Sequence, residues 1–164
     1  MKYKKIKNLV ELVIQPSIEF IKKSRKRTNT PFKEIEEILN VFFPKTKYHE
    51  SSKGYWKHVF VIHSGKKKLV LKMGRRGKDI WKDFTTYTQL RKYLGSAKAN
   101  RYFAKIYWRS GLFMLQKYGK KVRVPIATLQ KLKEFGKEHG LKDIREANIM
   151  KFDNQFKIVD AERR

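Results

Sequence analysis

Three oxygen-bearing side chains follow one another near the end of this 164-residue chain. Asp143 is followed five positions later by Asn148, and Asp160 comes directly after the strand-like run Phe156–Val159. In phosphoryl transfer from ATP, one carboxylate orients the attacking hydroxyl, while an amide oxygen and a second carboxylate hold Mg²⁺. This order of side chains indicates ATP-dependent phosphoryl transfer, with Asp143 as the catalytic carboxylate and Asn148 and Asp160 as metal ligands.

Residues earlier in the chain could hold the nucleotide. Lys72 follows the apolar run 69–71, so a strand would direct its ammonium toward the α- and β-phosphates. Ser51, Ser52 and Gly54 form a small-residue turn before the preceding strand, where hydroxyl and backbone N–H groups could cover the phosphates. We therefore expect Lys72 to act in catalysis and in nucleotide binding, together with this turn.

Two residues between a predicted strand and the next helix are candidates for contact with the adenine. Gln116 and Tyr118 belong to the segment 116–119, which would form the hinge of a nucleotide site. ATP, or another nucleoside triphosphate, with Mg²⁺ is thus the expected cofactor.

Each main candidate also has a simpler interpretation. Asp143 could be an exposed loop carboxylate, Asn148 a turn residue, and Lys72 one of many solvated lysines. Asp160 could simply end an edge strand. Their joint order and context favour the chemical interpretation.

The elements that must position these residues can be read from hydrophobic periodicity. Apolar residues at helical spacing predict helices over 6–21, 31–43, 78–94 and 125–138, with Pro16 interrupting or restarting the first. Shorter runs predict strands over 46–50, 56–63, 69–73, 103–108, 112–116, 149–152 and 156–159. This order predicts an α+β fold with a small antiparallel sheet lobe and a helical lobe. Residues 1–45 form an N-terminal helical extension, 46–116 the sheet lobe and 117–164 the second lobe.

Charge is the second strong feature of the sequence. There are 41 Lys and Arg residues against 15 Asp and Glu, which gives a formal net charge of +26. Such an excess favours a polyanionic partner, because a polyanion relieves the self-repulsion of the folded chain. A biased or thermophilic surface is the alternative, although thermophilic surfaces usually gain Glu together with Lys. No secretory segment is recognisable, so we expect a cytoplasmic protein without membrane contact.

The segment 139–160 resembles the catalytic and metal-binding loops of the protein-kinase-like superfamily, and 54–116 resembles its N-terminal lobe. The chain is most similar to the compact RIO and Bud32-type kinases, and among them to the archaeal RNA kinases. That resemblance implies a minimal bilobal kinase fold and phosphorylation of a ribose 2′-hydroxyl in the variable region of tRNA, at position 47.

The chain departs from the pattern of this superfamily at several places. Asp143 comes four positions after His139 instead of two, and Asp160 is followed by Ala-Glu instead of Phe-Gly. The helix predicted over 78–94 contains no Glu to pair with Lys72, which leaves Asp83 as the expected partner.

The acceptor is expected to be RNA. Only four residues follow Asp160, and we expect no segment of the kind that holds a peptide in protein kinases. A basic surface suits RNA, which carries phosphates and a 2′-hydroxyl along its length. Two alternatives remain: an atypical RIO-like serine/threonine protein kinase, and a non-catalytic RNA-binding pseudokinase.

Overall fold

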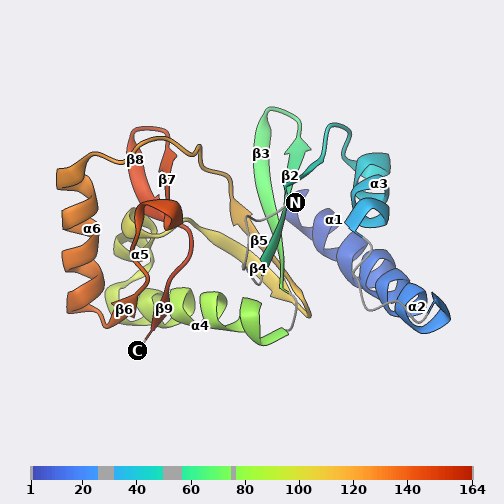
Figure 1. The fold of residues 1–164 in the computed structure, drawn as a ribbon, viewed down its shortest axis with the longest axis horizontal. Helices are drawn as coiled ribbons and strands as arrows, with labels where there is room; N and C mark the ends of the chain where they lie inside the picture. Colours follow the sequence, from blue (N-terminus) through green and yellow to red (C-terminus); the bar gives the residue numbers. More distant parts are fainter. Residues whose placement is uncertain (1, 26–31, 50–56, 75–76, 164) are drawn as a thin grey trace. The chain divides into compact units, whose positions relative to one another are not determined.

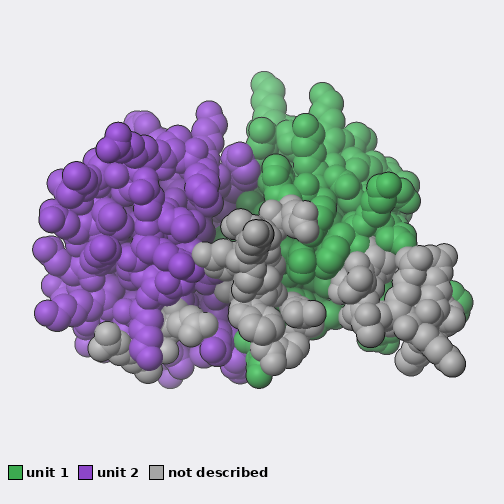
Figure 2. All heavy atoms as spheres, in the orientation of Figure 1, with its two compact units in different colours: residues 1–80, 107–116 green, residues 81–106, 117–164 purple. Residues whose placement is uncertain are grey.

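The chain folds into two compact units. The computed structural model describes residues 2–25, 32–49, 57–74 and 77–163. Unit 1 consists of Met1–Ile80 and Tyr107–Gln116, and unit 2 of Trp81–Ile106 and Lys117–Arg164 (Figure 2). The chain therefore returns to unit 1 for a single hairpin before it completes unit 2 (Figure 1).

Unit 1 begins with one continuous helix that contains a wide turn. Its parts are α1 (Lys2–Leu9), the π-helical segment η1 (Val10–Ile14) and α2 (Gln15–Arg25). The N–H of Gln15 donates to the carbonyl of Val10, five residues back, and this bond defines the wide turn. Pro16 follows directly. Its ring would clash with the carbonyl four residues earlier in a regular α-helix, so the wider turn lets the helix continue through the proline.

The other part of unit 1 is a five-stranded sheet in the order β1-β2-β3-β5-β4 (Figure 1). Its strands are β1 (Lys47–His49), β2 (Lys57–Ser64), β3 (Lys67–Gly74), β4 (Ile106–Ser110) and β5 (Phe113–Lys117). Strand β2 pairs antiparallel with β1 and along its whole length with β3. The β2–β3 hairpin turns at Gly65, whose φ of 63° is the left-handed conformation that glycine adopts without a Cβ penalty.

The N-terminal helices cover one face of this sheet. Helix α3 (Phe32–Phe42) joins α1 and α2 in contributing to a single apolar core, as we expect for helices that need a partner surface. Side chains that alternate along β2, β3 and β5 supply the other half of that core. The buried core residues are Ile6, Leu9, Val10, Ile14, Ile18, Ile35, Leu39, Phe60, Ile62, Leu69, Leu71, Met73, Phe113 and Leu115.

Unit 2 is mainly helical, with two small two-stranded sheets. Its helices are α4 (Gly77–Leu94, from Trp81 onward), α5 (Ser96–Tyr102) and α6 (Ile126–Glu138). Its strands are β6 (Leu141–Lys142), β7 (Ile149–Phe152), β8 (Gln155–Ile158) and β9 (Glu162–Arg163), with a 3₁₀ turn, η2, at Glu146–Asn148. Strand β6 pairs with β9, and β7 pairs with β8, antiparallel in both cases.

The predicted α+β fold class is confirmed: an antiparallel five-stranded sheet is combined with helices and an N-terminal helical segment. The predicted hairpin that turns at Asp153 is also present, with Ile149 opposite Ile158. Helix α5 and the pair β6–β9 were not predicted. The sequence of α5 is short and basic without an apolar stripe, and two-residue strands have too few positions to show alternation. Among the described residues, no helix is long and apolar enough to cross a membrane.

Candidate active site

The loop that follows β6 presents Asp143 in an uncommon backbone conformation. Its φ is 63°, in the left-handed region that Asp and Asn tolerate better than other residues with a Cβ. The side chain is 45% exposed, so its carboxylate is accessible to a substrate. A short polar residue is therefore suited to this position on backbone grounds as well as on chemical ones.

The side chain of Asn148 is hydrogen-bonded to Asp143. The side-chain amide nitrogen of Asn148 donates to the backbone carbonyl of Asp143 at 3.0 Å and to its Oδ2 at 2.9 Å. Both acceptors are oxygens, so the amide nitrogen must face them and the amide oxygen must point elsewhere. Asn148 is only 7% exposed, which makes these hydrogen bonds a rigid link within the loop. The five-residue spacing in the sequence therefore corresponds to a turn that is closed by hydrogen bonds from the Asn148 side chain to Asp143.

Asp160 is positioned by the strand that precedes it. The N–H of Val159 donates to the carbonyl of Asn148 at 2.9 Å, which extends the β7–β8 pairing by one step beyond Ile149 and Ile158. Asp160 follows immediately and is half-buried. The predicted metal ligands thus flank one hairpin at the same end: Asn148 directly precedes β7, and Asp160 follows β8 by two residues.

Two further residues of the loop escaped the sequence analysis. The Nε of Arg145 lies 3.0 Å from Oδ1 of Asp143 and pairs with the carboxylate on the side opposite Asn148. Glu146 accepts a hydrogen bond from the N–H of Val124 at 2.9 Å, which ties the loop to the segment before α6. Both lie between Asp143 and Asn148. A charged residue inside the expected catalytic loop is the sequence feature that could have identified them.

In unit 1, Lys72 and Gln116 occupy the sheet face that is opposite the N-terminal helices. Lys72 follows the core residue Leu71 and pairs with Val59, so alternation places it on that opposite face. Gln116 likewise follows the core residue Leu115 in the strand adjacent to β3. Lys72 is 6% exposed and Gln116 is 2% exposed. The predicted phosphate-binding and adenine-binding residues therefore share one face of one sheet.

Tyr118 precedes a segment that is held tightly against the β7–β8 hairpin. A Cβ on Gly119 would lie 2.6 Å from the ring of Phe152, so only glycine permits this approach. The backbones of Lys120 and Lys151 exchange two hydrogen bonds of 2.8 Å. The predicted hinge is thus anchored in unit 2 at its C-terminal end.

Three predicted nucleotide-binding residues, Ser51, Ser52 and Gly54, lie outside the described residues. Asp83, the expected partner of Lys72, is 5% exposed and belongs to unit 2, whereas Lys72 belongs to unit 1. Their pairing stays a prediction.

One lysine of the hairpin is engaged in the fold instead of facing solvent. The ammonium of Lys157 donates to the backbone carbonyl of Asn100, which joins β8 to α5. Burial lowers the pKa of Lys157 because it removes water from the ammonium, and the positive charge of Lys117 lowers it further. Lys157 is therefore a structural cation and a poor candidate for phosphate contact.

The oxygen donors present fit a magnesium ion. With its nitrogen on Asp143, Asn148 offers its amide oxygen, and Asp160 offers a carboxylate. Among the described residues, no group of three His, Cys, Asp or Glu side chains could hold a metal ion. One amide and one carboxylate suit Mg²⁺, which takes one or two protein ligands and completes its shell with phosphate and water.

Comparison with known proteins finds similarity only among solved structures. No protein-family model and no curated protein matches the chain. Among solved structures, the ternary complex of APH(2″)-IIa with streptomycin and ATP matches 70% of this chain at 22% identity and a TM-score of 0.39. The match covers 37% of that protein, so the chain spans well under half of its length.

Proposed function

We propose that this chain is an ATP- and Mg²⁺-dependent kinase that phosphorylates a ribose 2′-hydroxyl of tRNA. The observation that supports it most is the pair of hydrogen bonds from Asn148 to Asp143, with Asp160 at the same end of the hairpin. These bonds join the carboxylate of Asp143 to the amide of Asn148, and the backbone bond from Val159 to Asn148 brings the residue before Asp160 to the same end. Catalysis of phosphoryl transfer consists mostly of positioning the reactants and neutralising charge on the phosphates. One carboxylate can position the acceptor hydroxyl, and an amide oxygen and a second carboxylate can hold the metal ion that neutralises the charge.

The proposed roles follow from the chemistry of each group. Mg²⁺, when bound to the nucleotide phosphates, supplies the positive charge that phosphoryl transfer requires. Asn148 and Asp160 would hold it, and Asp143 would accept a hydrogen bond from the acceptor hydroxyl. As the hydroxyl oxygen bonds to the γ-phosphorus, the bond from that phosphorus to the β,γ-bridging oxygen breaks, and the hydroxyl proton passes to Asp143. Arg145 and Asn148 each contact one carboxylate oxygen, which fixes the orientation of Asp143.

Nucleotide binding by unit 1 is part of the same proposal. Lys72 would contact the α- and β-phosphates from the sheet face it shares with Gln116. A side chain on the middle of a paired strand loses little freedom on binding, which suits a group that must position phosphates.

The acceptor is inferred from charge. A formal net charge of +26 favours a partner with many phosphates, and RNA is a polyanion with a 2′-hydroxyl at each internal ribose. The choice of tRNA, and of its variable region, rests on the resemblance to RNA kinases.

Transfer of labelled γ-phosphate tests the proposal. We expect label in total tRNA, and a labelled nucleotide that survives alkaline hydrolysis together with its 3′ neighbour, because a 2′-phosphate prevents cyclisation at the adjacent phosphodiester. Asp143→Asn should lower kcat by roughly 10²- to 10⁴-fold, as expected for loss of a proton acceptor. Asn148→Ala should also lower kcat, because it removes a proposed metal ligand.

Asp153→Asn is the matched control. Asp153 is also an aspartate with a positive φ, 50°, but it lies in the β7–β8 turn and is 87% exposed. The same substitution there should leave kcat unchanged. Label found in protein instead of RNA would contradict this proposal and indicate a protein kinase. Binding of RNA with no transfer to any acceptor would indicate the non-catalytic alternative.

A further inference from the structure

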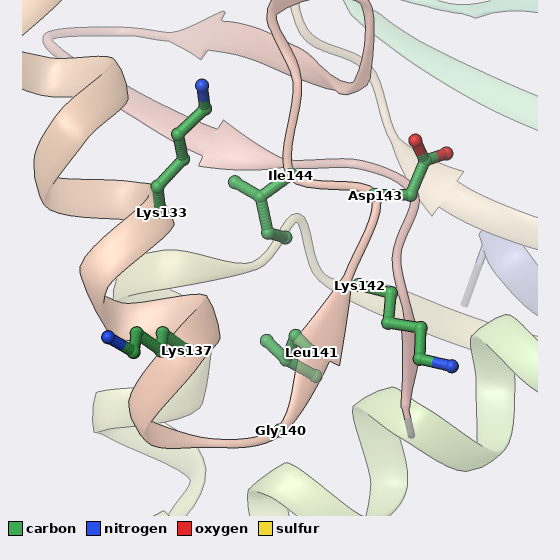
Figure 3. Close-up of a pocket in the computed structure, with 7 residues that line it drawn as sticks. All are labelled: Lys133, Lys137, Gly140, Leu141, Lys142, Asp143 and Ile144. Carbon is green, nitrogen blue, oxygen red and sulfur yellow. The ribbon is translucent and has the colours of Figure 1, made fainter.

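A cavity opens beside Asp143, and all of its lining residues belong to unit 2. Its volume is about 370 Å³, and Figure 3 shows the side chains around it. The lining residues are Lys133, Lys137, Gly140, Leu141, Lys142, Asp143 and Ile144. We call it the lysine pocket. It adjoins the proposed catalytic carboxylate, and neither Asn148 nor Asp160 is among its lining residues.

The pocket combines an apolar centre with a cationic rim. In Figure 3 the side chains of Leu141 and Ile144 lie in the middle of the view, and the side chains of the three lysines extend away from them, with their ammonium groups outermost. The lysines are exposed, so their long stems can reorient toward a ligand. The one acid in the lining, Asp143, is already paired with Arg145 at 3.0 Å. The rim therefore attracts anions.

The apolar centre is built by a close contact between the loop and α6. A Cβ on Gly136 would lie 2.7 Å from Cγ1 of Ile144, so the glycine lets Ile144 pack directly on the helix. Lys133 and Lys137 lie one helical turn apart on α6, and Lys142 comes from β6. The acids Glu134 and Glu138 of the same helix are not among the lining residues. Secondary structure thus places three lysines along the lining of one pocket.

We propose that the lysine pocket binds the nucleotide that neighbours the acceptor ribose in the RNA substrate. Its phosphodiester would lie on the lysines, and its ribose and base would lie against Leu141 and Ile144. A volume of about 370 Å³ is at the small end of the range for ligand sites, roughly 300 to 1,000 Å³, and suits a single nucleotide. This inference rests on the proposed function, because it places the acceptor next to Asp143.

The test compares two double variants that lose the same charge. Lys133→Gln with Lys137→Gln removes two cations from the pocket. Lys98→Gln with Lys131→Gln removes two exposed cations of unit 2, one from α5 and one from α6, that do not line it. Thermal unfolding of both variants establishes that each is folded. The dissociation constant for total tRNA is then measured across a series of salt concentrations, and KM and kcat are measured for phosphate transfer.

We expect the pocket variant to bind tRNA about tenfold more weakly than the control variant at moderate salt, with a matching rise in KM. The slope of log affinity against log salt is negative, and its magnitude should fall by roughly 0.7 to 1.4, since each lost phosphate contact contributes about 0.7 for a single strand. The control variant should change neither kcat nor KM. Equal losses of affinity in the two variants would overturn the pocket and leave the proposed function intact. A wild-type chain that neither binds nor phosphorylates RNA would overturn both.

Discussion

Unit 1 and unit 2 hold their functional side chains by different means. In unit 1, Lys72 is placed by a long strand whose neighbouring residue, Leu71, is fully buried in an apolar core. In unit 2, Asp143 lies in a loop at a positive φ and is held by Asn148 and Arg145. The first arrangement depends on non-directional burial, and the second on a few directional contacts. We therefore expect the units to respond differently to substitution.

The largest expected effect is in the core of unit 1. Leu71→Ala should lower the free energy of unfolding by about 2 to 5 kcal/mol, because it removes buried methyl groups and leaves a cavity. Lys67→Ala, at the exposed start of the same strand, should change it by less than about 0.5 kcal/mol. Chemical denaturation measures both values. Hydrogen exchange should show protection lost in β2 and β3 more than in β7 and β8. An equal loss in both units would mean that they unfold together, which would break the comparison.

A smaller effect is expected where the loop of unit 2 meets α6. Gly136→Ala alone should destabilise the chain by about 1 to 3 kcal/mol, because the new methyl group would lie 2.7 Å from Ile144. With Ile144→Ala already present, the same substitution should stabilise by up to about 1 kcal/mol, since alanine favours a helix more than glycine does. A double-mutant cycle gives the coupling. If Gly136→Ala has the same sign in both backgrounds, the close contact does not position the loop.

The smallest effect concerns the pH dependence of unit 2. The hydroxyl of Tyr87 donates to Oδ1 of Asn100 at 2.6 Å. Burial raises the pKa of Tyr87 above 10.0, and the positive charge of Arg91 opposes that rise. Because the pKa of Tyr87 is higher in the folded state, the contribution of its neutral hydroxyl to stability is complete below pH 10. That contribution is lost as the pH rises through the pKa of the folded state.

Tyr87→Phe tests this directly. Below pH 10 the variant should be less stable than the wild type by roughly 1 kcal/mol, the usual contribution of one hydrogen bond. The difference should shrink as the pH rises above 10, because only the wild type has this group to ionise. Denaturation at pH 9 to 11.5 measures it. A difference that is constant across that range would contradict the assigned pKa direction.

The regular elements were predictable from the sequence because their patterns are local. The alternation in 69–73 and the helical spacing in 78–94 each appear within one element, and the structure has β3 and α4 there. Pro16 shows the limit of such patterns: it predicts that the helix is interrupted or restarted, and only the structure shows that a π turn lets the helix continue. The short pair β6–β9 depends on two segments about 20 positions apart meeting, and neither segment has a pattern of its own.

The features of the candidate site likewise separate into those that the sequence determined and those that depend on tertiary packing. The sequence by itself determined the types and order of Asp143, Asn148 and Asp160, the position of Lys72 on a strand, and the excess of positive charge. Only the tertiary structure decided that the amide nitrogen of Asn148 faces Asp143, that Arg145 pairs with the same carboxylate, and that three lysines and two apolar residues line a pocket beside it. The physical reason is range. Backbone periodicity is a property of neighbouring residues, whereas a hydrogen bond or a close approach such as that at Gly136 exists only after distant segments have packed.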